Sequence, residues 1–213
     1  MAQHAFELFE TARPVGRTAA LRRLTRSLDS LVSTNADEAA VAARVGMVLR
    51  PALADSNLLE PHHCEPAEDR YRPHLVHVHP DGLYSVLALV WKPGQATPIH
   101  DHQCWCVVGV WRGLERETTY DLHDAGAAGP CLIERDSAVA SPGDVSVLVP
   151  PDEDIHRVEN CGSGIAISIH VYGDDISVLG SSINREFDDG LVRRRAPKQQ
   201  SAPLSWRALD GRR

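Results

Sequence analysis

The chain has 213 residues, which is enough for one ordinary domain and small for two. Hydrophobic residues make up 43% and charged residues 24%, as in soluble globular proteins, so the composition argues against a disordered chain. The formal net charge of −7 argues against a protein that binds nucleic acid or a membrane surface, because such proteins need a cationic face.

The sequence also predicts a location. No apolar run reaches about 18 residues, the length that a transmembrane helix requires. The segment from Met1 to Arg13 contains two glutamates and no apolar stretch of the secretory type. The five cysteines are odd in number and include no C-x-x-C pair. We therefore expect a reduced, cytoplasmic protein, monomeric or weakly homo-oligomeric, with no nucleic-acid or membrane partner.

Residues 1–68 are predicted to form a helical extension that packs on the rest of the chain. Between residues 19 and 32, leucines recur every three or four positions and arginines lie between them, as in an amphipathic helix. Asn35 is expected to cap a second helix, because Glu38 follows three residues later as in a capping box. This helix is expected to end at about Arg50, because Pro51 would kink a helix interior.

Residues 69–185 are predicted to form a barrel or sandwich of short strands. Runs of β-branched and apolar residues alternate with Gly/Pro turns and show no helical periodicity. The predicted strands are residues 75–79, 84–91, 105–111, 138–140, 145–149 and 165–171. Residues 186–213, which include three consecutive arginines, are expected to form a loosely ordered tail.

Three histidines are candidate metal ligands. His100 and His102 lie two residues apart in an extended segment, so their side chains project to the same face. His156 lies next to another predicted strand. Three neutral imidazoles from two strands can hold a divalent metal and leave coordination positions open. His77 and His79 have the same spacing, but we expect them on an exposed arm of a hairpin and assign them no metal.

The residues around these histidines resemble the two motifs of the cupin barrel. The first motif is matched by Gly94, His100, His102 and Gly113, and the second by Gly143, Pro151, His156 and Asn160. In the first motif Cys106 stands where cupins have an acidic ligand. The resemblance implies a mainly β fold, the cupin (double-stranded β-helix or jelly-roll) barrel, behind an N-terminal helical extension. It also implies a metal held by the three histidines without a carboxylate.

The missing carboxylate and one further motif resemble the cysteine dioxygenase family, the thiol dioxygenase branch of the cupins. Ser168, His170 and Tyr172 match the Ser-x-His-x-Tyr row of that family. The resemblance implies a non-haem Fe(II) bound by three histidines, with a small thiol and O₂ as partners and a sulfinic acid as product. It also implies that Tyr172 hydrogen-bonds the substrate or the bound oxygen, that His170 orients the phenol, and that Ser168 fixes the tautomer of His170.

In some members of this family a cysteine is joined to the tyrosine by a thioether. Cys106 is the candidate partner of Tyr172 in this chain, and Cys104, two residues away, is the alternative. Both thiols could instead be small apolar residues of the barrel core.

The substrate stays open between L-cysteine, our first expectation, and 3-mercaptopropionate. Family members hold the substrate carboxylate with an arginine that follows a tyrosine, but the matching position here is Pro73. Arg72 is the candidate in its place, with His74 as a weaker one, because a guanidinium suits a carboxylate and a proline does not. Trp105 is a candidate for the mouth of the pocket.

Two other functions fit the same motifs. A non-catalytic cupin could use the pocket to sense a small molecule or a metal, because this fold hosts many functions. A site of three histidines could also hold zinc or nickel for hydrolysis or isomerisation. The Ser-His-Tyr row favours the enzyme, because a binding module has no need for an ordered phenol that faces the metal.

Overall fold

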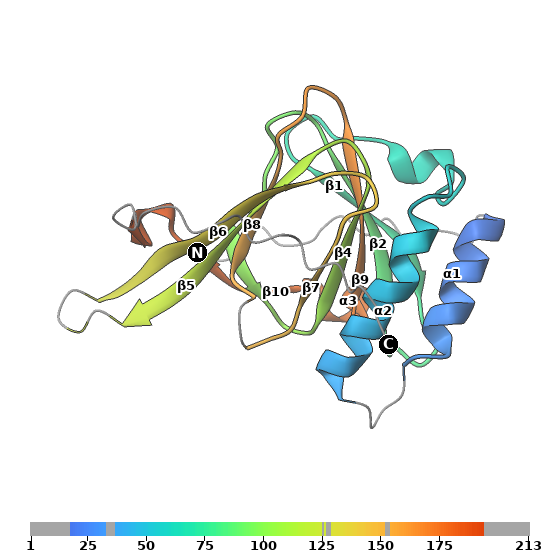
Figure 1. The fold of residues 1–213 in the computed structure, drawn as a ribbon, viewed down its shortest axis with the longest axis horizontal. Helices are drawn as coiled ribbons and strands as arrows, with labels where there is room; N and C mark the ends of the chain where they lie inside the picture. The colour runs from blue at the N-terminus through green and yellow to red at the C-terminus, as the bar shows by residue number, and fades with distance from the viewer. Residues whose placement is uncertain (1–17, 33–36, 125, 127–128, 152–153, 194–213) are drawn as a thin grey trace, which may run out of the picture.

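The computed structural model describes residues 18–32, 37–124, 126, 129–151 and 154–193. Two largely antiparallel sheets curl around a common interior (Figure 1). The five-stranded sheet has the order β1 (Arg72–Val78), β2 (Ser85–Trp91), β9 (Ala166–Tyr172), β4 (Cys106–Arg112) and β7 (Val145–Leu148). The six-stranded sheet has the order β10 (Ile183–Phe187), β3 (Ile99–His102), β8 (His156–Asn160), β5 (Glu115–Asp124), β6 (Pro130–Ala140) and β11 (Val192–Arg193). This arrangement is the mainly β cupin barrel that the sequence predicts.

Two helices, α1 (Ala19–Asp29) and α2 (Glu38–Ala52), cover the outer face of the five-stranded sheet (Figure 1). The leucines of α1 point into this interface, as their spacing predicts, and α2 lies over β4 and β7. The short elements are η1 (Pro61–Cys64), α3 (Ile176–Leu179) and η3 (Asp189–Leu191). The expected extension therefore packs on one sheet of the barrel.

The second helix begins and ends later than expected. Asp37 caps it, with its side chain accepting a hydrogen bond from the backbone of Ala40, whereas Asn35 lies outside the described residues. The helix also continues through Pro51 to Ala52. Pro51 lacks one backbone donor, but the helix ends at the next residue, so no further turn has to accommodate the kink that a proline produces.

Strand β9 is buried on both faces because it lies between the helices and the barrel interior. Its residues Ile167, Ile169 and Val171 belong to the apolar cluster beneath the helices. Ser168, His170 and Tyr172 alternate with them and therefore face the interior. This alternation places a polar row inside the barrel.

The expectation of an exposed hairpin arm at His77 is wrong. The His77 side chain is buried, and its Nε2 lies 3.1 Å from the hydroxyl of Tyr84. The same hydroxyl donates a hydrogen bond of 2.7 Å to Asp29 at the end of α1. The strand is covered at this point because α1 packs across it, which the local sequence does not reveal.

Five strands, β3, β5, β8, β10 and β11, lie outside the predicted runs, because they are short or rich in polar residues. Strand β10 extends to Phe187 and β11 follows at Val192–Arg193, so the first residues of the expected tail belong to the six-stranded sheet. The rest of the tail, residues 194–213, lies outside the described residues.

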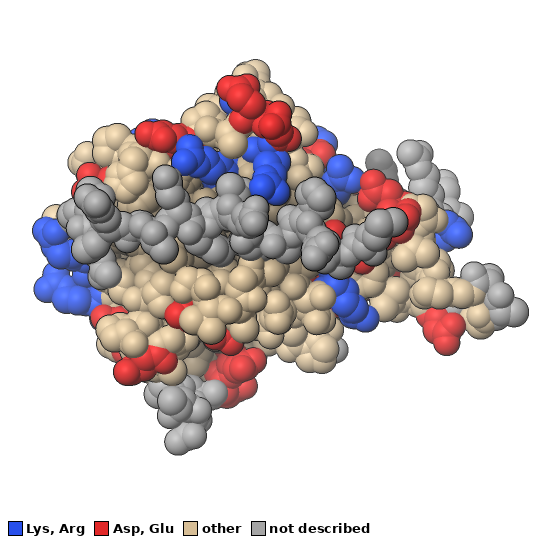
Figure 2. All heavy atoms as spheres, turned by 180° about the vertical axis from the view of Figure 1, so that it is seen from behind, with Lys and Arg blue, Asp and Glu red and all other residues tan. Residues whose placement is uncertain are grey.

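Among the described residues, no helix has the length and apolar character needed to span a bilayer. On the face of the molecule shown in Figure 2, acidic and basic side chains lie in small separate groups around a largely uncharged centre.

Candidate metal centre

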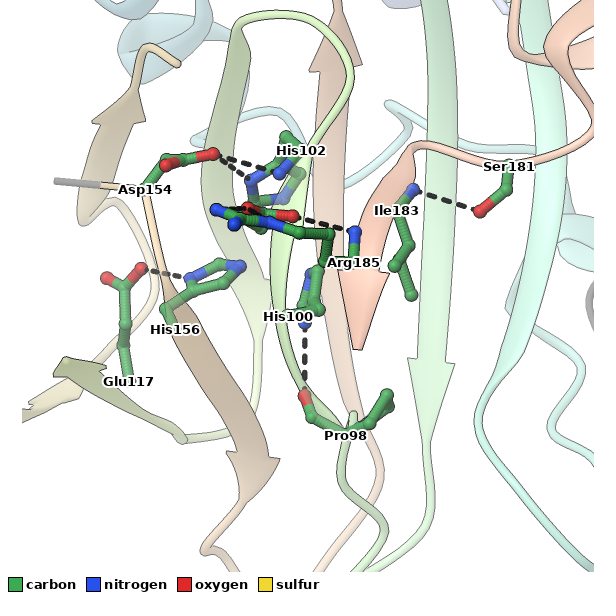
Figure 3. A network of polar contacts seen from close by, with 10 residues as sticks. Pro98, His100, His102, Glu117, Asp154, His156, Ser181, Ile183 and Arg185 are labelled. Atoms are coloured by element: carbon green, nitrogen blue, oxygen red, sulfur yellow. Dashed lines mark hydrogen bonds and ion pairs between the residues drawn. The ribbon is translucent and has the colours of Figure 1, made fainter. Parts of the chain in front are cut away.

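Three histidines converge inside the barrel (Figure 3). His100 and His102 lie on one face of β3, and His156 on β8 is directly paired with His100. One ring nitrogen of each lies within 4.8 Å of those of the other two. All three side chains are at least 95% buried, so the predicted ligands form a cluster shielded from bulk solvent.

Hydrogen bonds on one ring nitrogen fix the orientation of His100 and His156 (Figure 3). His100 Nδ1 lies 3.0 Å from the carbonyl oxygen of Pro98, which can only accept, so Nδ1 carries the proton. His156 Nδ1 lies 2.7 Å from Oε1 of Glu117 and donates to it in the same way. In both rings Nε2 is left as the free electron-pair donor. This is the arrangement in which protein histidines usually bind metals.

Asp154 supports the third ligand. Its Oδ2 accepts a hydrogen bond of 2.9 Å from the backbone N–H of His102 and lies 3.8 Å from Nδ1 of the same residue. The carboxylate therefore favours the tautomer of His102 that keeps its proton on Nδ1. The backbone of β3 is further held from outside the barrel by Arg185, which donates to Asp101 at 2.6 Å.

The surroundings keep His100 and His102 uncharged. Burial lowers the pKa of His100 well below 6.5, and His156 and His102 nearby lower it further. Burial also lowers the pKa of His102. For Glu117, burial raises the pKa, but the hydrogen bonds from His156 and Ser146 and the nearby rings of His156 and His102 together outweigh this, so the net shift is downward. Neutral imidazoles with ionised carboxylates behind two of them fit a divalent transition metal such as Fe(II).

A second polar chain runs along β9 beside the histidine cluster. Ser168 Oγ lies 2.9 Å from His170 Nε2, and His170 Nδ1 lies 3.2 Å from the hydroxyl of Tyr172. Trp91 donates its indole N–H to Ser168 at 3.1 Å. Burial lowers the pKa of His170 to about 3, with further lowering by His156 and His102. The imidazole is therefore neutral, so one of its ring nitrogens donates a hydrogen bond and the other accepts one. His170 thereby links the hydroxyl of Ser168 to that of Tyr172.

The cavity in front of the three histidines is largely apolar and includes no lysine or arginine among its described lining residues. It is lined by Tyr71, Pro73, Leu87, Leu89, Thr97, His100, His102, His156, Val158, His170, Tyr172, Ile176, Ser182 and Ile183. Hydroxyl groups and imidazoles are thus the polar groups that it offers to a ligand. The row from Ser168 to Tyr172 reaches this cavity through His170 and Tyr172.

The structure distinguishes the two candidate thiols. Cys106 on β4 is directly paired with Tyr172 on β9, and its side chain interacts with the phenol. Cys104 precedes β4 and interacts instead with the backbone of Gly173. Burial raises the pKa of Cys106 well above 9.0. Of the two thiols, Cys106 is therefore the one that the strand register sets against the tyrosine.

The two candidate substrate-binding residues lie away from the cavity. Arg72 is on β1 between Tyr71 and Pro73, which line the cavity, and its guanidinium lies 3.5 Å from Glu65 outside the barrel. The ring of His74 likewise contacts the backbone oxygen of Glu65, at 2.8 Å. The structure does not bring the side chains of Arg72 and His74 to the cavity, because side chains alternate along a strand.

Trp105 is buried in the cluster beneath the helices and lies outside the described cavity lining. Its indole packs against the backbone of Gly173, which directly follows Tyr172. Trp105 therefore belongs to the packing that supports the end of β9.

Sequence reasoning missed the acidic residues of the site. Glu115 is buried and Glu117 half-buried on β5, within a run so rich in charge that it resembles a surface loop. Their spacing of two residues is the available signal, since it places both carboxyl groups on one face of a strand. Asp154, six residues before Asn160 of the second motif and two before His156, carried no such signal.

The family model described as cysteine dioxygenase type I matches residues 31–179, which is more than half of the chain. A conserved protein with a double-stranded β-helix domain from Klebsiella pneumoniae subsp. pneumoniae is similar in structure. It has 17% identity and a TM-score of 0.41, with 57% of this chain and 92% of that chain covered. A cupin superfamily protein from Desulfitobacterium hafniense has 14% identity and a TM-score of 0.38, with 52% and 84% covered. On the family match, this chain belongs to the cysteine dioxygenase type I family.

Proposed function

We propose that this protein is a non-haem Fe(II) thiol dioxygenase, which adds both atoms of O₂ to the sulfur of a small thiol and yields a sulfinic acid. The observation that carries the proposal is the meeting of three buried histidines with the row of Ser168, His170 and Tyr172 at one cavity. L-Cysteine is the first candidate substrate, and 3-mercaptopropionate is the alternative. The free cysteines are in keeping with a cytoplasmic location.

His100, His102 and His156 would hold the metal through their Nε2 atoms. Bound Fe(II) supplies the redox chemistry with O₂ and favours the thiolate form of the substrate, because three neutral ligands leave its double positive charge uncompensated. Glu117 keeps His156 in the tautomer that binds metal, and the nearby charge of Asp154 favours the same tautomer in His102. The apolar walls of the cavity exclude water from the reacting atoms.

The phenol of Tyr172 would orient the substrate or O₂ by a hydrogen bond. His170 holds the phenol oxygen through Nδ1, and Ser168 holds the opposite nitrogen of the same ring. Because burial keeps His170 neutral, the ring carries a single proton, and its position decides whether Tyr172 donates to His170 or to the cavity.

We also propose that Cys106 and Tyr172 become joined by a thioether. The bond forms between Sγ and the ring carbon next to the phenol carbon, with loss of the thiol hydrogen and one ring hydrogen, and O₂ accepts the two electrons and two protons. The direct pairing of Cys106 with Tyr172 across β4 and β9 supports this proposal.

The contrasting function is a cupin that senses a metal or small molecule without turnover. The two functions differ in what happens to O₂, since a sensor would bind a thiol without consuming oxygen. Zinc or nickel in the same site would likewise consume none. The three functions are therefore separated by metal analysis combined with oxygen consumption.

The test is O₂ uptake by protein loaded with Fe(II) without oxygen, with L-cysteine and 3-mercaptopropionate compared and the products identified by mass. We expect uptake matched by sulfinic acid. His100→Ala should lose iron, whereas His123→Ala, a change at an exposed histidine on β5, should retain it. Full iron occupancy without uptake for any thiol would overturn the dioxygenase, and full iron in His100→Ala would overturn the ligand assignment.

A further inference from the structure

Glu115 is a buried carboxyl group that the proposed mechanism leaves unused. It lies on β5 and is only 1% exposed, and neither of its oxygens has a hydrogen bond of good geometry with the described residues. It faces a small cavity in the barrel interior, next to the metal cavity, with Val158 lining both. This interior cavity has room for about one water molecule.

Every element packed against Glu115 contributes to its surroundings. Its own strand adds Glu117, and the turn before β7 adds Asp144, with Ser146 following on β7. Strand β9 adds the hydroxyl of Ser168, which interacts with the Glu115 carboxyl group. The remaining neighbours lining the cavity, on β4, β6 and β8, are apolar: Val108, Val110, Ala140 and Val158.

Glu115 holds a proton at neutral pH. Burial raises its pKa to about 8, the hydroxyl of Ser168 offsets part of the shift, and the negative charge of Glu117 adds to it. A protonated carboxyl group is a hydrogen-bond donor, whereas a carboxylate can only accept. Ionisation therefore removes its only donor, and a bond that it donated before must reverse.

Ser168 transmits this direction, because its hydroxyl has one donor and two acceptor positions. The indole N–H of Trp91 can only donate, so it always occupies one acceptor position. One donor and one acceptor position remain for Glu115 and His170. If Glu115 donates, Ser168 must donate to His170; if Glu115 accepts, His170 must donate to Ser168. A single water between Glu115 and Ser168 would pass on the same direction.

We propose that Glu115 is a positioning residue whose proton sets the tautomer of His170 and so turns the phenol O–H of Tyr172. With Glu115 protonated, His170 Nε2 accepts from Ser168 and its Nδ1–H donates to the phenol oxygen, which frees the phenol proton for the cavity. With Glu115 ionised, the proton of His170 moves to Nε2, and Tyr172 then donates its proton to Nδ1 and away from a ligand. The effect on turnover rests on the proposed function, but the tautomer does not.

The test is therefore made on the metal-free protein, by ¹⁵N NMR of labelled histidine from about pH 6 to about pH 10. The protonated and unprotonated ring nitrogens of a neutral imidazole have distinct shifts, so the tautomer of His170 is read directly. We expect Nδ1–H at the acidic end, Nε2–H at the alkaline end, and a midpoint near pH 8. His170→Asn identifies the resonance.

Glu115→Gln should abolish this transition, because the amide does not ionise, and Ser168→Ala should abolish it by breaking the chain. Glu134→Gln, the same change at an exposed position of β6, should leave it intact. A wild-type tautomer that stays constant over the whole range would overturn the proposal, and so would a transition that survives in Glu115→Gln. Both outcomes are independent of whether the iron-loaded protein consumes O₂.

Discussion

Glu117 on β5 and His156 on β8 meet with 2.7 Å between the carboxylate oxygen and Nδ1, although the two residues are far apart in the sequence. Burial raises the pKa of this half-buried carboxyl group, but the hydrogen bonds from His156 and Ser146 and the nearby rings of His156 and His102 together lower it, so the carboxylate stays ionised. In return it fixes the proton of His156 on Nδ1. The ligand atom Nε2 is thereby available before any metal binds.

Glu117→Gln should weaken Fe(II) binding by about 10-fold or more, because the amide lacks the charge that makes His156 a better donor. The dissociation constant is measured by anaerobic titration with Fe(II) and a competing chelator. Glu134→Gln at an exposed position of β6 serves as the control and should bind as the wild type does. Equal affinity in Glu117→Gln would contradict the supporting role of this carboxylate.

Cys106→Ser should prevent the proposed thioether, whereas Cys104→Ser should permit it, because Cys106 is the residue paired with Tyr172. The crosslinked protein is lighter by two hydrogen atoms, and digestion yields a joined peptide from β4 and β9. The measurement is mass spectrometry after incubation with Fe(II), thiol and O₂. A joined peptide that persists in Cys106→Ser would show that another cysteine forms the thioether.

Pro73→Arg should lower the KM for thiols with a carboxylate by about 10-fold, because it places a guanidinium in a cavity whose described lining has no lysine or arginine. The KM of a neutral thiol of equal length, such as 3-mercaptopropanol, should not fall. Arg72→Gln is the matched control on the adjacent residue and should leave both KM values unchanged, since Arg72 faces Glu65. A raised KM for thiols with a carboxylate in Arg72→Gln would show instead that Arg72 binds the substrate carboxylate.

Glu115→Gln should stabilise the fold increasingly as the pH rises from 4.5 towards 8. In this window the folded wild type holds a proton on Glu115 that the unfolded chain has released, since the pKa is about 8 in the fold and 4.5 outside it. Stability therefore falls with rising pH by about 1.4 kcal/mol per unit from this group alone. Urea unfolding of both proteins across the range measures the difference. A difference that is independent of pH would show that Glu115 is ionised throughout.

Gly173→Ala should cost about 2 kcal/mol of stability, because a methyl group at this position would overlap the indole of Trp105. Gly164→Ala, where an added methyl group meets no other atom, should change stability by no more than about 0.5 kcal/mol. Chemical denaturation followed by tryptophan fluorescence measures both. An unperturbed Gly173→Ala would mean that Trp105 moves readily and has room on another side.

The sequence was sufficient to predict the parts of the site whose residues are neighbours along one strand. The spacing of two between His100 and His102 predicted a shared face, and the same alternation predicted the row from Ser168 to Tyr172. Their joint cavity also follows from the family motifs. The fold class could be predicted for a related reason, since Gly/Pro turns delimit six of the strands.

The rest depended on contacts between segments far apart in the chain. Glu117 turns inward because it meets His156 from another strand, and a charged run gives no sign of that partner. His77 is buried because α1 covers β1. The position of Trp105 likewise follows from how β4 and β9 pack beneath the helices. None of these contacts produces a recognisable pattern in the sequence around the residue.

The two-sided burial of β9 restricts how its length can change. Its odd-numbered residues hold the sheet to the helices, and its even-numbered residues form the polar row. Inserting or deleting one residue within the strand would exchange the two sets, sending isoleucines to the metal cavity and Ser168, His170 and Tyr172 under the helices. Stability and chemistry would therefore be lost together, so this strand can accept substitutions while its residue count stays fixed.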